Sequence, residues 1–563
     1  MRTISFLLAI GAVVVPNQAP GQAGGAAPAL ERLPEWGRIR TAAAPVLGWR
    51  VGIAASNFRQ LTLSEAAAKA GEMGLSAIAG FSAQKISAEI PKNLDYNLAP
   101  GEVMAVKDRL RGLNVRMPVY HIASINPDEP ALRKLFEFAK SLGIETIVCA
   151  PGASSLTIID KLANEYGVRA ALDGYRDPKN LLEAMEARSK RIGAHLDFGS
   201  WSQAGIQPRD LLALLKERVF AVSVPGTGQS GLPEFLRDMY RLELKPSLIT
   251  VDTTSAADLS IQGFEKALQP VMADRVNQIS RTTAIRGPDR VAPKDRERIE
   301  AALPQQAAAK PKKPRKLLVM DLNIAYGGHR SIPHANLALE LMGKRTGAYE
   351  AIFSNDLENL KFEKIRQFDA VYLNNMVGMI FVDPDVRDGL TRFIREGGGL
   401  AGHHGTTHAS MDWAEFSEMI GARGGSHRDP TERATLKVDD PASPLTAAFE
   451  GRELVQEDEF YRFPTGPYSR ETLHVLLSID VDKTDMNQGR ACARCFRPDH
   501  DYAVSWIRSY GKGRVFYCTL GHDPTFFMTP HMAQHFLAGI QFVLGDLDAD
   551  TTPSAKLVTR TEK

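Results

Sequence analysis

Eight short apolar segments between residues 51 and 252 limit the fold of this chain more than any other feature. Helix-like stretches, such as residues 64–73 and 102–113, separate these segments. Strands that alternate with helices favour a parallel sheet, and eight such units favour a closed (β/α)8 barrel. We predict the strands at residues 51–56, 77–82, 115–122, 146–151, 168–173, 192–198, 219–225 and 247–252.

Polar residues stand at the ends of several predicted barrel strands. The chemistry of (β/α)8 barrels lies at the C-terminal ends of the strands. His121, Asp173, Asp197 and Asp252 are expected at this mouth of the barrel. Their nitrogen and oxygen atoms could gather around a divalent cation.

Two sequence phrases of the barrel, residues 163–168 (ANEYGV) and 196–199 (LDFG), resemble the xylose-isomerase-like sugar isomerases and the type-2 AP-endonucleases. The resemblance implies a metal site of Glu, His and Asp ligands. The chain departs from that pattern, because Ser200 and Ser223 stand where histidines are expected. The departures favour a barrel that acts as a scaffold, a sugar-binding surface or a lid. The alternative is an isomerase or epimerase that uses Asp197 and Asp252.

A change of composition separates this barrel, residues 49–282, from the rest of the chain. Residues 294–303 predict one helix, and residues 304–316 are rich in Pro, Ala, Gln and Lys. Such a composition is typical of a semi-rigid linker. We therefore expect a linker at residues 283–316.

The second domain, residues 317–552, begins with a buried strand and is followed by a tail at 553–563. Helices are expected between its early strands, at residues 332–342 and 384–396. The pattern predicts a flavodoxin-like or class I amidotransferase-like α/β sandwich with an antiparallel extension. Its strands are expected at 317–322, 351–354, 370–373, 400–403, 434–438, 475–479, 502–508 and 514–520.

Residues 397–408 (GGGLAGHHGTTH) predict a strand, a sharp turn and the start of a helix. In α/β folds such an elbow lifts one side chain above the C-terminal edge of the sheet. That side chain is usually a Ser or Cys nucleophile. Here it is expected to be His404.

Histidines gather in the second half of the chain. Of 13 histidines, only His121 and His195 precede the linker. Imidazoles near carboxylates can bind a divalent metal or carry out acid–base chemistry near neutral pH. The alternative is a set of independent polar histidines at loop ends. The histidines at predicted turns are His329, His403, His404, His408, His427 and His522, and Asp458 and Glu459 add two carboxylates.

Residues 316–552 resemble the trehalose-utilisation, ThuA-like family, which is related to the class I glutamine amidotransferases. The resemblance rests on residues 329–333 (HRSIP), 397–405, 458–463 (DEFYRF) and 511–517 (GKGRVFY) running into Leu520-Gly521-His522-Asp523. It implies a small carbohydrate, such as a sugar or keto-sugar, as the partner. The nucleophilic Cys of the amidotransferases is missing, because His404 occupies the elbow. A thioester mechanism requires that Cys, so we exclude Cys-dependent glutamine hydrolysis.

Within this domain we assign expected roles to individual side chains. His404, His522 and Glu459 are the expected catalytic residues. A divalent metal of unknown identity is a possible cofactor. The expected metal ligands are His404, His427 and His522, and the expected substrate-binding residues are His329, His403, Tyr461 and Asp523.

The first 23 residues are typical of a secretory signal peptide. Arg2 supplies the positive charge, and the apolar run at 4–15 is too short to span a bilayer. Gly21-Gln22-Ala23 gives small residues at a cleavage site. We expect residues 24–48 to form a leader and the mature protein to be periplasmic or secreted, without a later membrane span. An uncleaved anchor is the alternative.

The net charge of +2 over 563 residues favours neither nucleic acid nor an acidic membrane surface as a partner. The chain has four cysteines, too few for a disulfide scaffold. Cys492 and Cys495 could close a local disulfide in an oxidising compartment. Cys149 and Cys518 lie in apolar segments and are expected in the core.

These observations favour an exported protein whose second domain binds and processes a sugar or keto-sugar. A lyase, isomerase or hydrolase reaction would fit the His and carboxylate residues. One alternative is a non-catalytic sugar-binding or assembly protein with decayed sites. The other places the reaction in the barrel.

Overall fold

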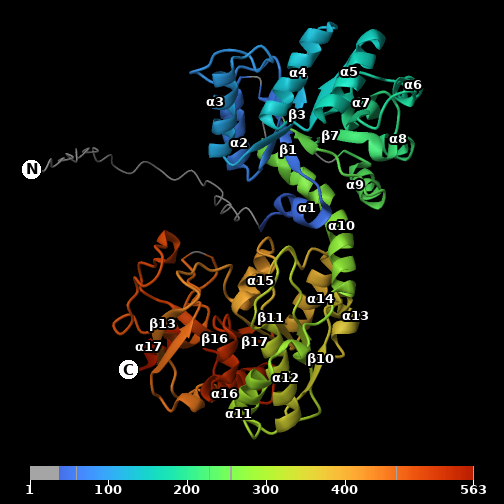
Figure 1. The fold of residues 1–563 in the computed structure, drawn as a ribbon. Coiled ribbons are helices and arrows are strands. Elements are labelled where there is room, and N and C mark those ends of the chain that lie inside the picture. Colours follow the sequence, from blue (N-terminus) through green and yellow to red (C-terminus); the bar gives the residue numbers. More distant parts are fainter. Residues whose placement is uncertain (1–36, 59, 227–228, 254–256, 465, 562–563) are drawn as a thin grey trace, which may run out of the picture.

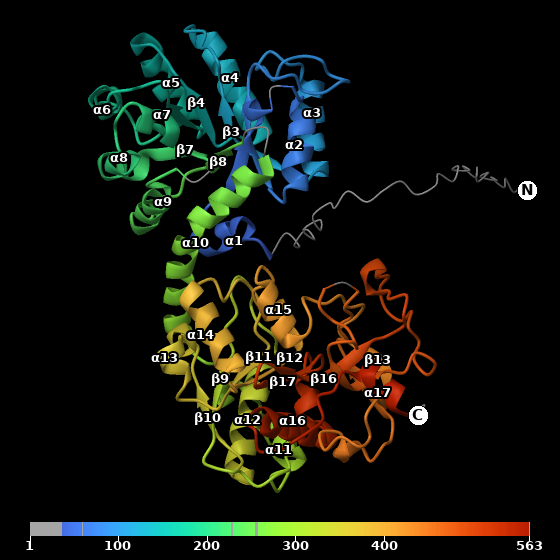
Figure 2. The ribbon, with the colours of Figure 1, turned by 180° about the vertical axis from the view of Figure 1, so that it is seen from behind.

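The computed structural model describes residues 37–58, 60–226, 229–253, 257–464 and 466–561. Two domains lie at either end of a long helix, α10 (Ala257–Thr282), as Figures 1 and 2 show. The predicted signal peptide and the beginning of the predicted leader lie outside the described residues. The signal peptide and export stay predictions. No helix in the described ranges combines the length and hydropathy that a membrane span needs.

The first domain is a closed barrel of eight parallel strands, as predicted. The strands follow one another around the barrel in chain order, and β1 pairs with β8 to close it. Their inward and outward faces are both covered, so the strands are apolar along most of their length. The strands are β1 Val51–Ala54, β2 Ala77–Phe81, β3 Arg116–His121, β4 Thr146–Cys149, β5 Arg169–Leu172, β6 Ile192–Asp197, β7 Val219–Pro225 and β8 Leu248–Asp252.

Helices connect these strands and form the outer layer of the barrel. Six of them end at a glycine or begin with proline near the first turn, which are common helix stop and start signals. The helices are α2 Leu63–Glu72, α3 Pro100–Gly112, α4 Glu129–Leu142, α5 Ala153–Tyr166, α6 Pro178–Glu186, α7 Phe198–Gln203, α8 Pro208–Leu215 and α9 Leu232–Arg241.

The second domain is built on a nine-stranded mixed sheet. The strand order is β10-β9-β11-β12-β17-β16-β15-β13-β14, with the first five strands parallel and the others antiparallel. This arrangement confirms the predicted open sheet and its late antiparallel extension. The strands are β9 Lys316–Met320, β10 Glu350–Phe353, β11 Ala370–Asn374, β12 Gly399–His403, β13 Glu432–Val438, β14 Leu454–Asp458, β15 His474–Ile479, β16 Ala503–Tyr510 and β17 Gly513–Cys518.

Each face of this sheet packs on helices. Alternate residues of a strand point to opposite faces, so in β12 Leu400 joins one hydrophobic core and Ala401 joins the other. The core on the Leu400 side continues into the core of the barrel. Helices α14 (Pro384–Arg395) and α15 (Ala414–Ile420) cover that side, and α11 (Pro293–Ala302), α12 (Ile332–Thr346) and α16 (Pro530–Val543) cover the other. The short α13 (Phe362–Ile365) and the C-terminal α17 (Ser554–Thr561) complete the domain.

Four details differ from the sequence-based description. Residues called leader form helix α1 (Ile39–Leu47), which packs on α10. The segment called linker contains the predicted helix, α11, but it is attached to the second domain, since the backbone of Ala309 hydrogen-bonds with the side chain of Gln541. The tail contains α17. Strand β14 was not predicted.

Helix α1 directly precedes β1, so it lies at the N-terminal end of the barrel strands. Figure 1 shows α1 between the two domains. The strand ends that carry Asp197 and Asp252 therefore point away from the second domain.

Candidate functional site

The predicted elbow lies at the centre of the second-domain sheet. Strand β12 ends at His403, and a short helix, η6 (His404–His408), begins at His404. His404 has a φ of +42°, in the left-handed region that residues other than glycine rarely adopt. Gly402 allows the turn, because a Cβ atom there would lie 2.7 Å from the side chain of Thr406. This elbow places His404 at the C-terminal edge of the sheet.

Hydrogen bonding fixes the ring of His404. Its Nδ1 lies 2.8 Å from the backbone oxygen of Thr519. A carbonyl oxygen can only accept, so Nδ1 donates to Thr519 and the ring turns Nε2 toward the edge of the sheet. Nε2 lies 3.3 Å from Oε2 of Glu459. The ring of Tyr461 stacks on His404 with 4.3 Å between centroids.

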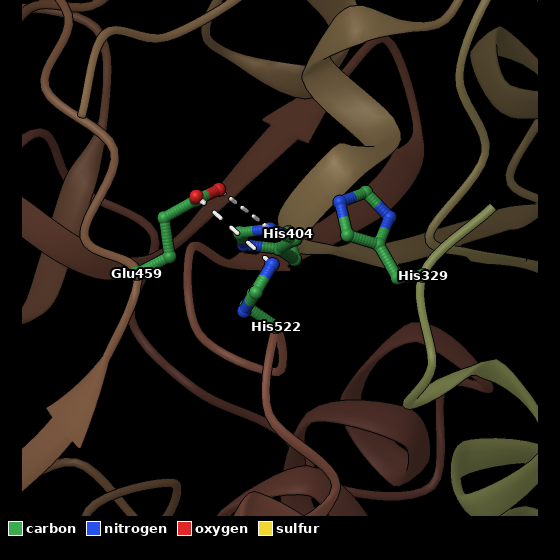
Figure 3. A group of neighbouring side chains, drawn as sticks. All are labelled: His329, His404, Glu459 and His522. Atoms are coloured by element: carbon green, nitrogen blue, oxygen red, sulfur yellow. Dashed lines mark ion pairs between the residues drawn. The ribbon is translucent and has the colours of Figure 1, made fainter. Parts of the chain in front are cut away.

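Three further side chains meet His404 from different parts of the chain (Figure 3). His329 comes from the loop after β9, Glu459 directly follows β14, and His522 follows β17. One nitrogen or oxygen atom from each of His329, His404, Glu459 and His522 lies within 4.8 Å of the others. We call these four residues the His/Glu cluster. Ligands of open α/β sheets gather at this edge.

Asp458 links the segment that carries Glu459 to the loop that carries His522. Its buried carboxylate accepts hydrogen bonds from the backbone N–H groups of Gly521 at 2.8 Å and His522 at 3.1 Å. It also accepts one from Glu459 at 2.8 Å. Burial raises the pKa of Asp458 to about 6. The sequence indicates a carboxylate at this position but not its role as an anchor for the two loops.

The surroundings favour neutral imidazoles beside a carboxylate. Burial and the nearby His404 and His522 lower the pKa of His329 to about 2. Burial also lowers the pKa of His522. Burial opposes ionisation of Glu459, but its contacts with His404 and His427 hold its pKa below the usual range.

These four residues fit a divalent cation. Metal-binding histidines must be neutral, and their second nitrogen usually donates to an oxygen, as Nδ1 of His404 donates to Thr519. Nδ1 of His329 is buried and has no hydrogen-bond partner among the residues that the structure describes. Three imidazoles and one carboxylate are ligands typical of Zn²⁺ and similar ions.

The composition of the cluster differs from the predicted grouping at two residues, whose roles stay predictions. His427 was expected as a metal ligand, but it lies outside the group of four and instead contacts Oε1 of Glu459 through Nδ1 at 3.0 Å. His329 was expected to bind substrate and instead belongs to the cluster. The predicted catalytic residues His404, His522 and Glu459 are brought together.

Two of the predicted substrate-binding residues do not face the cluster. His403 is fully buried, with Nδ1 at 2.9 Å from the hydroxyl of Tyr372 and its ring packed on Phe527 and Phe536. Its position in β12 puts it on the side of α16, as strand alternation requires. Oδ1 of Asp523 accepts from the backbone and hydroxyl of Thr525, so it caps a short helix. Tyr461, 5% exposed, supports the ring of His404.

The barrel mouth has a different arrangement, centred on His195, which sequence analysis did not select. His195 Nδ1 lies 3.2 Å from Asp173 Oδ1, and its Nε2 lies 2.8 Å from Ser223 Oγ. Burial opposes ionisation of Asp173, but the hydrogen bond with His195 lowers its pKa to about 2. Thr250 extends the network at 2.8 Å from Ser223. The signal for His195 is its spacing of two residues from Asp197, which puts both on one face of β6.

The predicted residual metal site of the barrel is not assembled. His121 packs edge-on against His195, with 5.2 Å between centroids. Asp197 caps α7 by accepting from the backbone of Ser200 at 2.8 Å. Burial and Asp197 raise the pKa of Asp252 to about 6. In the part of the chain that the structure describes, no group of barrel residues has the spacing of the His/Glu cluster.

No cysteine thiol lies at the elbow to act as a nucleophile. Cys492 and Cys495 form a disulfide, a pairing that the sequence had left open. Cys149 and Cys518 are buried in strands, as predicted, and burial raises the pKa of both thiols. All four cysteines of the chain fall within the described ranges.

Residues 316–543 match the ThuA family, described as trehalose utilisation, which confirms the resemblance of the second domain. No curated protein matches the chain. Among solved structures, a protein from Parabacteroides distasonis is 23% identical, covering 40% of this chain and 99% of its own, with a TM-score of 0.36. A ThuA-like protein from Bacteroides uniformis is 18% identical (44% and 98% covered, TM-score 0.35). A D-allulose 3-epimerase from Methylomonas sp. is 18% identical (40% and 97% covered, TM-score 0.31). At these values the likenesses assign no activity to this chain.

Proposed function

We propose that the second domain binds a divalent cation at the His/Glu cluster and processes a carbohydrate there. The observation that carries this proposal is the convergence of four ligand atoms within 4.8 Å. The orientation of His404 supports it, because Nδ1 donates to the backbone oxygen of Thr519 and Nε2 faces the cluster. Such an arrangement is typical of metal-binding histidines.

A sugar or keto-sugar is the proposed substrate class. The support is the match of residues 316–543 to a family described as trehalose utilisation, since trehalose is a disaccharide. The proposed setting is the periplasm or the exterior of the cell, as the signal-like N-terminus suggests.

The side chains of the cluster differ in their access to a substrate. His404 and Glu459 are buried, whereas the side chain of His522 is 30% exposed. His522 is therefore placed to give or take a proton at a sugar hydroxyl or carbonyl oxygen. His427, 31% exposed beside Glu459, borders the same space. A cation bound here would supply polarisation of a substrate oxygen.

A second candidate places an isomerase or epimerase reaction in the barrel. The observation in its favour is the carboxyl of Asp252, whose pKa burial and Asp197 raise to about 6. A group of this kind can act as an acid or a base near neutral pH.

Metal content of the purified full chain tests the first proposal. Wild type should hold one equivalent of a divalent metal by elemental analysis, and the variant His404→Ala/His522→Ala should hold none. The matched control is His500→Ala/His531→Ala, because both of these histidines are exposed and lie outside the cluster. It should keep the metal.

Full metal content in the cluster variant would contradict the assignment of the cluster. Loss of turnover on sugars and keto-sugars in that variant alone would support catalysis in the second domain. Unchanged turnover in that variant, with loss in Asp252→Asn, would favour the barrel.

A further inference from the structure

A cavity of about 330 Å³ lies where helix α1 meets the second domain. One wall comes from α1, and the others come from the loops that follow β9 and β11. The walls include Thr41, Pro45, Ile324, Tyr326, Val377 and Met379. Its size falls at the lower end of small-molecule sites, which span about 300–1,000 Å³.

The cavity adjoins the His/Glu cluster. Tyr326 lines the cavity, and its hydroxyl lies 3.3 Å from Nε2 of His329. Val377 also lines it, and a Cβ atom on Gly405 would lie 2.9 Å from Val377 Cγ2 and 3.2 Å from His329 Cε1. His408 forms part of the wall and packs on Tyr461, with 4.9 Å between ring centroids. The cavity and the cluster are therefore direct neighbours, separated by side chains that contact both.

The lining is apolar and uncharged. Thr41, Tyr326 and His408 are the polar side chains among the described residues that line the cavity, and none of the lining residues is Asp, Glu, Lys or Arg. Tyr326 is 45% exposed, so its ring is open to a ligand in the cavity. Such a cavity disfavours a phosphate or carboxylate, because no charge compensates for lost hydration.

Contacts fix the wall that α1 provides. Arg40 of α1 pairs with Glu265 of α10 at 2.9 Å. The side chain of Arg275 donates to the backbone oxygen of Val46 at 3.3 Å. Helix α10 in turn holds the second domain, because Asn277 donates to Asp383 at 2.8 Å. The wall therefore belongs to one packed unit with the cluster.

We propose that this cavity is a subsite, built jointly by α1 and the second domain, for the apolar aglycone of a neutral glycoside. The sugar of that glycoside reaches the His/Glu cluster, and this part of the inference rests on the proposed function. An aromatic or alkyl group in the cavity contacts Tyr326, Val377 and Met379. The barrel thus contributes to substrate selection in the neighbouring domain.

The test fills the cavity from the side of α1 in the full chain. Thr41→Trp and Pro45→Trp place an indole in the cavity, and Pro45 is exposed, so its replacement leaves the core intact. Ala44→Trp is the matched control, because Ala44 lies on the same helix, is exposed and does not line the cavity. Binding is measured by calorimetry for 4-nitrophenol, methyl β-D-glucopyranoside and 4-nitrophenyl β-D-glucopyranoside.

Wild type and Ala44→Trp should bind the nitrophenyl glycoside about 10- to 100-fold more tightly than the methyl glycoside, the gain expected from burying one ring. Both filled variants should lose that preference, lose 4-nitrophenol binding and keep their metal. Equal binding of the two glycosides by wild type, or an unchanged preference in both filled variants, would overturn the subsite. Binding of 4-nitrophenol without binding of either glycoside would support the apolar subsite and refute the proposed sugar function.

Discussion

The barrel mouth and the His/Glu cluster both place a buried histidine at the C-terminal ends of parallel strands, yet they differ in how that histidine is bonded. His195 has both ring nitrogens within hydrogen-bond distance of protein groups, Asp173 and Ser223. His404 donates through Nδ1 to Thr519 and turns Nε2 toward other potential ligands. A histidine whose two ring nitrogens both hydrogen-bond to protein groups is a structural residue. A histidine that keeps one ring nitrogen without such a bond is a candidate metal ligand.

The two regions also differ in orientation. The barrel strands end on the side away from the second domain, whereas α1, at their N-terminal side, lies beside the second-domain loops. The barrel mouth and the cluster therefore do not form one active site. Helices α1 and α10 supply contacts between the barrel side and the second domain.

The largest expected effect is at Glu459. Glu459→Gln removes the negative charge of the cluster and should weaken metal binding by at least about 100-fold, more than the loss of a supporting partner. Turnover should fall by roughly 10²–10⁴-fold. Competition titration with a metal chelator measures the affinity. Glu457→Gln, an exposed neighbour on β14, is the control and should behave as wild type. Equal metal affinity in both variants would remove the distinction between the two regions.

A smaller effect is expected from His195 in the barrel. His195→Ala breaks the link between Asp173 and Ser223 and leaves buried polar groups without a partner. The barrel should lose about 2–4 kcal/mol of unfolding free energy. Hydrogen exchange of the barrel strands, read by mass spectrometry, measures the loss domain by domain. Metal content should stay at the wild-type value, and a variant depleted of metal would show that the two regions are coupled.

The smallest effects are expected from pH, with opposite signs in the two domains. Burial lowers the pKa of His535 to about 4, below its unfolded value near 6.5. The unfolded chain then binds the extra proton, so this group makes the second domain less stable as pH falls from 6.5 to 4. The slope is at most about 1.4 kcal/mol per pH unit. Asp252 acts in the other direction, because its raised pKa lets the folded barrel bind a proton first between about pH 6 and 4.

Variants isolate these two contributions. Unfolding free energies of wild type and each variant are compared at pH 6.5 and 4.5 by hydrogen exchange, corrected for intrinsic rates. His535→Gln should flatten the pH response of α16, and Asp252→Asn should remove a stabilisation of β8 on acidification. The same pH response in wild type and both variants would show that neither group accounts for the contrast.

The fold could be predicted from the sequence because apolar segments of strand length recur at regular intervals. All eight barrel strands and eight of the nine second-domain strands were expected. Strand β14 was not predicted, because its residues LVQED lie at a sheet edge and carry two acidic side chains. Helix α1 was not predicted, because Pro45 and the alanines around it are typical of an unstructured leader.

The candidate site could be predicted only in part. The elbow sequence identified His404, and the family resemblance identified Glu459 and His522. His329 belongs to the cluster and His427 does not, contrary to the predicted grouping. This difference depends on how the loops after β9 and α15 fold, and no local sequence pattern indicates it. The exclusion of His403 was within reach, because strand alternation places it on the face opposite Leu400.

The position of α1 has a consequence for the order of assembly. Leu47, its last residue, precedes Ile324 by 277 positions, so the two walls of the cavity are made at very different times during synthesis. Domains generally fold as units, beginning with the one nearer the N-terminus. The second domain must then dock against a barrel that is already folded before the cavity exists. A chain that ends before Ile324 therefore contains only the α1 wall of the cavity.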